Sequence, residues 1–274
     1  MTDTNDYIRK MAASQPLVQP TVRAAIQALG LPAASRGLDA GCGIGLQSLL
    51  LAQAVGPNGH VTGLDISAEF LVYAEQMVKE SPFAEQISFR EGDVRHLPFD
   101  DGVFDWAWSS DCVGYGAAME PSLGLPALKE LARVVKPGGT LAIYAWSSET
   151  LLPGYPLLEA HLDATAPGLA PFAPGKDPDL HFLRALGWLG EVGLEDVKAQ
   201  TFVGEAAAPL SDALRQALVE LFEMRWPGVE AELSEEDRAE YRRLCLPQSP
   251  DLILNDADYY AFFTCTMFSG TVAA

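Results

Sequence analysis

Basic residues, cysteines and long apolar runs are all scarce in this sequence. It has 18 lysines and arginines against 37 aspartates and glutamates, a formal net charge of −19. Nucleic-acid phosphates and anionic lipids are bound by clustered basic side chains, so this balance argues against both kinds of partner. No run approaches the roughly 20 apolar residues of a membrane span, and the N-terminus lacks the apolar segment of a signal peptide. We therefore expect a cytoplasmic protein with no membrane partner.

The four cysteines are widely spaced and form no C-x-x-C pair, and no histidine stands near them at metal-ligand spacing. They are Cys42, Cys112, Cys245 and Cys265. Scattered thiols of this kind are typical of reduced cysteines in a cytosolic protein. The sequence therefore predicts neither a disulfide framework nor a metal site.

The acidic charge is uneven along the 274 residues. Residues 1–150 carry a net −7 and residues 151–274 a net −12. One interpretation is that the extra acids of the C-terminal half face water and keep the protein soluble. The alternative is an acidic pocket wall in the C-terminal half, which would favour a neutral or cationic small molecule.

Strand and helix patterns alternate between residues 36 and 146, which predicts a doubly wound α/β fold with a mostly parallel sheet. Strands are expected at 36–40, 60–67, 86–94, 103–110 and 140–146. Helices are expected at 21–30, 46–54, 68–79 and 127–135, the last ended by a Lys-Pro-Gly-Gly turn at 136–139. In such sheets ligands bind beyond the carboxyl ends of the strands.

After residue 146 the alternation changes, and we expect one domain, 1–274, whose substrate side is a helical lid and insertion at 147–192 and 205–257. Six prolines between residues 153 and 178 indicate a loop. Helices are expected at 157–164, 180–192, 212–225 and 234–244, with strands near 197–203 and at 259–268.

The most informative segment is LDAGCGIG, residues 38–45, which runs from a strand into a helix. Its glycines leave no side chain between the backbone and a ligand, and the helix N–H groups point outward there. A dinucleotide fingerprint needs glycine at position 46, where Leu46 stands, so a nicotinamide cofactor is disfavoured. A purely structural turn is the other interpretation of this segment.

Two acids follow the next two strands. Asp65 ends the strand at 60–67, where a carboxylate can accept hydrogen bonds from a ribose diol or stabilise the start of a helix. Asp93 ends the strand at 86–94, where it can accept a bond from an exocyclic amine while Val94 donates its backbone N–H. Each acid alone fits a structural role. Together with the glycine turn they indicate a nucleoside-binding edge.

These segments resemble the class I S-adenosylmethionine-dependent methyltransferases, in the branch of ubiquinone/menaquinone-biosynthesis-type and other small-molecule enzymes. The resemblance spans about residues 36–146, in the family's order and spacing. It rests on LDAGCGIG (38–45), GLDIS (63–67), EGDVRHLPF (91–99), FDWAWSSDCVGY (104–115) and KELARVVKPGGTL (129–141). The implied fold is a seven-stranded Rossmann-like sheet with an antiparallel last strand.

The resemblance implies S-adenosyl-L-methionine as cofactor and S-adenosyl-L-homocysteine as product. The implied cofactor-binding residues are Asp39, Gly41, Cys42, Gly43, Asp65, Ile66, Asp93, Val94, Ser109 and Ser110. The side chain of Cys42 is itself expected to pack. Asp111 and Tyr115 are the catalytic candidates because they follow the fourth strand, and Asp111 is open to roles as a base, a cation partner or a loop cap.

The implied reaction is in-line displacement of a methyl group from a sulfonium by an oxygen, nitrogen or carbon atom of a small acceptor. Two alternatives stay open: a nicotinamide-dependent oxidoreductase, and a cofactor-binding module without catalysis. The expected partner is a neutral or cationic small molecule, and the sequence also leaves a homodimer open.

Overall fold

The computed structural model describes residues 4–113, 121–165, 179 and 181–274, and divides the chain into two compact units. The first unit comprises Met1–Thr21, Ser147–Pro178 and Val203–Cys265. The second comprises Val22–Trp146, Asp179–Phe202 and Thr266–Ala274. Within the part of the chain that is described, every helix is too short or too polar to cross a membrane.

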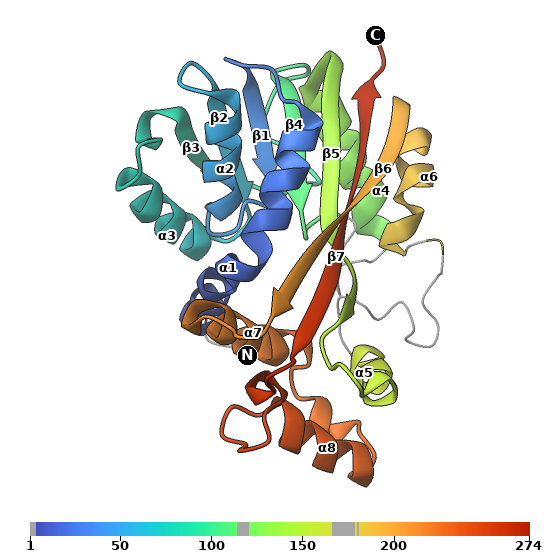
Figure 1. Cartoon of the computed structure of the whole chain (residues 1–274). Coiled ribbons are helices and arrows are strands. Elements are labelled where there is room, and N and C mark those ends of the chain that lie inside the picture. The colour runs from blue at the N-terminus through green and yellow to red at the C-terminus, as the bar shows by residue number, and fades with distance from the viewer. Residues whose placement is uncertain (1–3, 114–120, 166–178, 180) are drawn as a thin grey trace. The chain divides into compact units, whose positions relative to one another are not determined.

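The strands form one seven-stranded sheet in the order β3-β2-β1-β4-β5-β7-β6 (Figure 1). They are β1 (Arg36–Ala40), β2 (His60–Asp65), β3 (Ile87–Glu91), β4 (Phe104–Ser110), β5 (Val135–Thr150), β6 (Leu194–Ala207) and β7 (Tyr260–Val272). Strands β1 to β5 pair in parallel, and the last strand is antiparallel. The predicted fold class is confirmed. Each of β5, β6 and β7 begins in one unit and continues in the other.

The helices include both long amphipathic elements and single turns. The α-helices are α1 (Thr4–Leu29), α2 (Leu46–Val55), α3 (Ala68–Lys79), α4 (Pro121–Val134), α5 (Pro156–Asp163), α6 (Ala185–Glu191), α7 (Asp212–Arg225) and α8 (Glu235–Cys245). The 3₁₀ turns are η1 (Ala84–Gln86), η3 (Phe182–Arg184), η4 (Val229–Ala231) and η5 (Ile253–Asn255). Serine caps fix three of the starts, because Ser67, Ser211 and Ser234 accept the N–H groups of Phe70, Leu214 and Asp237.

Helix α1 is far longer than the predicted helix at 21–30. The sequence places Pro16 and Pro20 inside it, and proline removes a helix hydrogen bond. The two prolines stand four residues apart and are both exposed, so they share one outer face. Water can satisfy the carbonyls that they leave without a partner, and buried residues such as Leu17 and Ile26 hold the other face. The expected start at residue 21 was therefore wrong.

The turn expected at 136–139 is part of β5. Val135 pairs with Phe104 and Thr140 with Trp106, so five steps along β5 match two along β4. The extra residues form an irregularity in the ladder, and Gly138 adopts a left-handed φ of 79° there. The Pro-Gly-Gly signal thus marks a bulge at the amino end of a strand.

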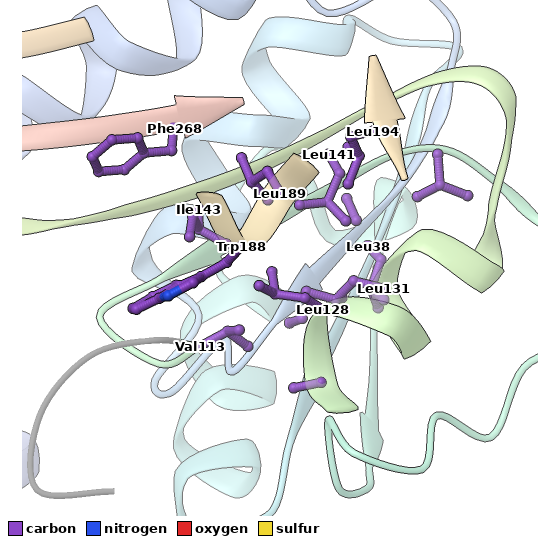
Figure 2. Packing of buried hydrophobic residues seen from close by; sticks show 14 of the residues in the cluster. Leu38, Val113, Leu128, Leu131, Leu141, Ile143, Trp188, Leu189, Leu194 and Phe268 are labelled. Atoms are coloured by element: carbon purple, nitrogen blue, oxygen red, sulfur yellow. The ribbon is translucent and has the colours of Figure 1, made fainter. Parts of the chain in front are cut away.

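Successive side chains of β1 show what covers each face of the sheet in the second unit. Leu38 and Ala40 belong to a buried cluster that includes Leu131 of α4 and Leu189 of α6 (Figure 2). Side chains alternate along a strand, so Asp39 points to the opposite face, where its carboxylate meets α2. The helices therefore cover both faces, as the alternating pattern predicted.

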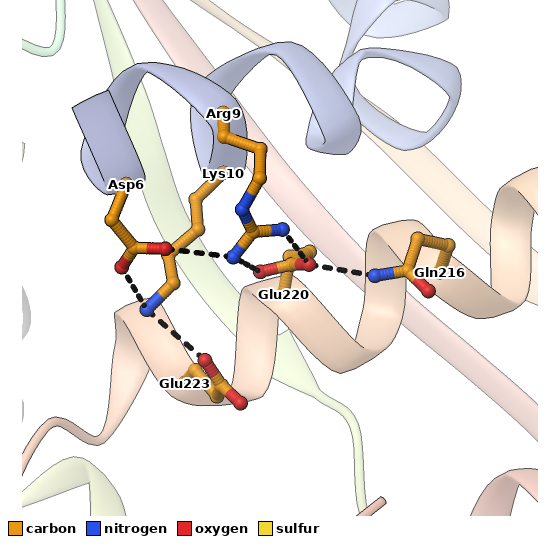
Figure 3. Close-up of polar contacts among 6 residues, drawn as sticks. All are labelled: Asp6, Arg9, Lys10, Gln216, Glu220 and Glu223. Atoms are coloured by element: carbon orange, nitrogen blue, oxygen red, sulfur yellow. Dashed lines mark hydrogen bonds and ion pairs between the residues drawn. The ribbon is translucent and has the colours of Figure 1, made fainter.

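In the first unit, the start of α1 is joined to α7 by charged side chains (Figure 3). Arg9 pairs with both oxygens of Glu220, whose side chain is only 5% exposed, and Gln216 donates to the same carboxylate at 2.6 Å. Lys10 bridges Asp6 and Glu223 at 3.0 Å each. Because Glu220 is buried, Arg9 supplies the countercharge on which this attachment depends.

The first unit also contains a buried acidic cluster at the end of β5. Glu149 forms an ion pair with Arg225, with 2.9 Å between Oε2 and Nη2, and their side chains are 1% and 9% exposed. Asp163 accepts a bond from Trp226 at 3.1 Å, and its negative charge acts on Glu149. Burial raises the pKa of Glu149 to about 8 despite the opposing charge of Arg225.

This raised pKa predicts a pH-dependent stability difference. The pKa of Glu149 is 4.5 without the fold and about 8 within it, so its contribution to stability is complete below 4.5 and is lost as the pH rises towards 8. Relative to Glu149→Gln, the wild type should therefore lose up to about 1.4 kcal/mol per pH unit across that window. Urea unfolding at several pH values measures the difference. The exposed Glu236→Gln is the control, and parallel profiles for wild type and Glu149→Gln would contradict the assignment.

Candidate functional site

The carboxyl ends of β1, β2, β3 and β4 meet at one edge of the sheet in the second unit. The parallel registers place Asp65 opposite Glu91, and Asp39 opposite both Gly63 and Trp108. The glycine turn, Asp65, Asp93 and Ser110 follow or end these strands. The sequence-predicted residues are thus brought together, and the local contacts distinguish their roles.

Asp39 lies inside the protein. Its side chain is buried, and Oδ2 accepts a 2.6 Å hydrogen bond from Ser48 on α2. Burial raises the pKa of Asp39 to about 7, although the bond from Ser48 acts in the opposite direction. This geometry makes Asp39 a brace between β1 and α2 beneath the turn.

Asp65 joins the glycine turn to the start of α3. Its Oδ2 accepts the backbone N–H of Gly43 at 2.8 Å, and its Oδ1 accepts that of Ser67 at 2.9 Å. A carboxylate has about four acceptor positions, so this half-buried group retains capacity for further donors. The neighbouring Ile66 is 68% exposed and presents an apolar side chain beside it.

The glycines of the turn have different surroundings. Gly41 has φ 75°, and an added Cβ would collide with Cys112 Sγ. Gly43 has φ 52°, and an added Cβ would meet nothing within 4 Å. Cys42 is buried and packs, as expected. The turn is therefore closely packed behind Gly41 and open above Gly43. We call the open space beside the Gly43 backbone the cradle, and a side chain at this position would fill it.

Asp93 is occupied by a neighbouring residue that the sequence analysis missed. Arg95 contacts both carboxylate oxygens through its guanidinium, and its backbone N–H donates to Oδ1 at 2.8 Å. This pairing lowers the pKa of Asp93 below its ordinary value. Val94 is half-buried against the hydrophobic cluster that includes Leu38 and Leu131. The signal for Arg95 was present, because a basic residue two positions after an acid can fold back on it.

The two serines at the end of β4 differ in exposure. Ser109 is buried, donates to the Ala40 carbonyl at 2.8 Å and accepts the N–H of Val113, so it ties β4 to β1. Ser110 is half-buried and donates to Asp111 Oδ2 at 3.0 Å. Only Ser110 presents its hydroxyl in a polar network. Tyr115 lies outside the described residues.

A directed chain of hydrogen bonds ends on Asp111. The indole N–H of buried Trp108 can only donate, so Gln47 must accept it with Oε1, at 2.7 Å. The amide Nε2 of Gln47 then donates to Ser110 at 2.9 Å, which directs the Ser110 proton to Asp111. The backbone N–H of Trp146 donates to the other Asp111 oxygen at 3.2 Å. The indole N–H of Trp108 thus sets the direction of every hydrogen bond from Gln47 to Asp111.

The backbone of Asp111 is also constrained. Its φ of 48° is left-handed, which is uncommon for a residue other than glycine, and its N–H donates to the Tyr144 carbonyl at 2.9 Å. Such conformations persist where surrounding contacts hold them, often in functional sites. Gln47 was missed by sequence reasoning because nothing local links it to Trp108, 61 positions away.

Comparisons with known proteins identify the family of this chain. A family model described as a methyltransferase domain matches residues 38–139. A demethylmenaquinone methyltransferase of Staphylococcus epidermidis is 33% identical over 187 residues, which cover 64% of this chain and 73% of that protein. Another, from Bacillus cytotoxicus, is 38% identical over 118 residues, covering 43% of this chain and 47% of that protein. The match thus spans about half the length of several of these relatives.

A solved structure, phosphoethanolamine N-methyltransferase 2 of Haemonchus contortus in complex with S-adenosyl-L-methionine, has a TM-score of 0.52 and 16% identity. The superposed region covers 92% of this chain and 52% of the Haemonchus contortus chain. At this identity the similarity shows a shared fold. The chain belongs to the class I S-adenosylmethionine-dependent methyltransferases of the menaquinone/ubiquinone type. S-Adenosylmethionine is accordingly its cofactor, and the open cradle at Gly43 and the acceptor capacity of Asp65 fit such a molecule.

The two glycines separate folding from binding. Gly41→Ala should destabilise the protein markedly, since it adds a collision with Cys112 to the left-handed strain. Gly43→Ala should cost only about 1–2 kcal/mol of stability, the penalty for a left-handed alanine. It should nevertheless weaken S-adenosylhomocysteine binding at least about tenfold, because its methyl group fills the cradle. Thermal unfolding and calorimetry measure both effects, and unaltered binding by a folded Gly43→Ala would refute the cradle.

Gln47 offers a matched pair of substitutions. Gln47→Leu leaves the buried Trp108 N–H without its acceptor, which should cost about 1–3 kcal/mol of stability. Gln47→Glu keeps that acceptor but cannot donate to Ser110, so it should be less destabilising and should turn the Ser110 proton away from Asp111. Urea unfolding and the indole ¹H–¹⁵N resonance of Trp108 test this. Equal losses and equal resonance shifts for both variants would show that the chain of bonds is unimportant.

Proposed function

We propose that this chain transfers the methyl group of S-adenosylmethionine to a small-molecule acceptor. The observation that carries the proposal is the carboxylate of Asp65, which holds the turn at Gly43 open while retaining acceptor capacity. A turn that was only structural would have no need of an open face beside an exposed apolar residue, Ile66. Because β5, β6 and β7 are common to both units, we propose that the chain acts as one domain.

In this proposal each residue at the edge binds one part of the cofactor. Asp65 accepts the ribose hydroxyls, and the backbone at Gly41 and Gly43 contacts the methionine part. Asp93 and the N–H of Val94 bind adenine. Asp39 and Ser109 act from beneath, by holding β1 against α2 and β4.

The bound cofactor supplies an electrophilic methyl group on a sulfonium. The protein then has to orient the acceptor for in-line attack and to exclude water, and orientation alone is worth on the order of 7–11 kcal/mol. Ser110 and Asp111 lie at the end of β4, where we place the acceptor. Asp111 can take a proton from a hydroxyl acceptor or pair with a cationic one.

We propose a neutral or cationic acceptor, selected by segments 147–192 and 205–257. The net charge of −12 over residues 151–274 supports this preference. The relatives named for demethylmenaquinone make a quinol ring the first acceptor to test. A quinol is uncharged, and its hydroxyl provides a proton for Asp111 to accept.

Asp65→Ala should weaken S-adenosylhomocysteine binding about 10–100-fold, which corresponds to about 1.4–2.7 kcal/mol for lost hydrogen bonds to a charged acceptor. Asp105→Asn is the matched control, because Asp105 pairs with Lys136 and the backbone N–H of Arg36 at the amino ends of the strands. Isothermal titration calorimetry measures both. Unchanged binding by Asp65→Ala would remove the cofactor assignment at this edge.

A panel of quinols, phenols and amines, read out by S-adenosylhomocysteine formation, tests turnover. Product formation with one class identifies the acceptor atom. Cofactor binding without turnover across the panel would instead favour a module without catalysis. Stabilisation by NAD, but not by S-adenosylhomocysteine, in a thermal-shift experiment would favour an oxidoreductase.

A further inference from the structure

Both oxygens of the Asp93 carboxylate are occupied by one residue. Oδ1 accepts the backbone N–H of Arg95 at 2.8 Å and its Nε at 2.9 Å. Oδ2 accepts the same Nε at 2.9 Å and Nη2 at 2.5 Å. Nε carries one hydrogen, which the two oxygens share, so three N–H groups of Arg95 take up most of the about four acceptor positions of the carboxylate. A donor from a ligand therefore competes with the guanidinium for the oxygens of Asp93.

The guanidinium is the part that can be released. Its side chain is 41% exposed and that of Asp93 is 26% exposed, so both groups have solvent beside them. Among the described residues, Arg95 makes its hydrogen bonds and its ion pair with Asp93. The side chain is therefore anchored to nothing else and can rotate outward, while the backbone N–H keeps its bond and holds the loop.

We infer that Arg95 is a competitive latch on the adenine subsite: its guanidinium contacts both oxygens of Asp93 in the free protein and competes there with the exocyclic amine of the cofactor. This rests on the proposed function, in which Asp93 binds adenine. The latch exchanges an internal ion pair for an intermolecular hydrogen bond, so it lowers cofactor affinity. It also makes the 6-amino group of the purine the feature that opens the subsite.

If Arg95 competes with the ligand, removing this arginine should increase the affinity for S-adenosylhomocysteine. Arg95→Met should bind S-adenosylhomocysteine about threefold more tightly than the wild type, a modest gain because exposed ion pairs are weak. Arg95→Lys should lie between the two, since an ammonium cannot reproduce the guanidinium fork. Raising sodium chloride from about 0.02 M to about 0.5 M should narrow the gap, because salt screens the wild-type pair.

The probe that separates a latch from a general effect is the S-adenosylhomocysteine analogue whose purine lacks the 6-amino group. This analogue has no donor for Asp93, so Arg95→Met should bind it as the wild type does. Arg90→Met is the matched control for lost charge. Arg90 is an exposed residue of β3 whose guanidinium lies over Phe99, 5.0 Å from the ring centroid, and its removal should leave both affinities unchanged.

Calorimetry with the intact chain decides between the outcomes. Tighter binding of S-adenosylhomocysteine alone by Arg95→Met supports the latch. Equal or weaker binding of S-adenosylhomocysteine by Arg95→Met overturns it, as does an equal gain for both ligands, while the proposed function stands. Absence of S-adenosylhomocysteine binding by the wild type and all variants overturns the proposed function and the latch with it.

Discussion

The two backbone hydrogen bonds accepted by Asp65 are the contact on which the site depends. One fixes Gly43 in the glycine turn and the other fixes Ser67, which caps α3. Through one carboxylate, the loop after β1 and the helix after β2 keep a constant separation. The open face above Gly43 exists because the turn is held at this point and is tightly packed against Cys112 at Gly41. A single carboxylate thus holds two separate segments of the candidate site together.

The acids of the chain fall into distinct physical classes. Asp39 and Glu149 are buried, and burial raises the pKa of each, so they act as internal braces. Asp93 is partly exposed and paired, and its pKa is lowered by Arg95. Asp111 is exposed and held by donors on both oxygens. The net charge of the sequence therefore does not identify which acids belong to the candidate site, because acids of the same type have different surroundings.

The sequence predicts those parts of the structure that short-range physics decides. The strand–glycine–helix pattern located β1, the turn and α2, and helices such as 68–79 were placed correctly because their caps and apolar spacing are local. Helix α1 was underestimated because proline stops a helix only when its lost bonds cannot be satisfied. The bulge at 136–139 depends on the partner strand, which no local signal reports.

The candidate site follows the same division. Asp65, Asp93 and the glycines were recognised from motifs, whereas Gln47 acts through Trp108, a contact that only the folded sheet creates. Ser109 and Ser110 are adjacent and chemically identical in sequence. The alternation of the strand buries one and leaves the other in a polar network, and only a three-dimensional structure assigns which is which.

A crystal structure of the chain with S-adenosylhomocysteine tests the central claim most directly. The account predicts the ribose hydroxyls within hydrogen-bond distance of Asp65, and the homocysteine part over the backbone at Gly43. It also predicts the 6-amino group on Asp93 with the Arg95 guanidinium turned away. A ligand bound elsewhere, or a ribose that makes no contact with Asp65, would contradict it.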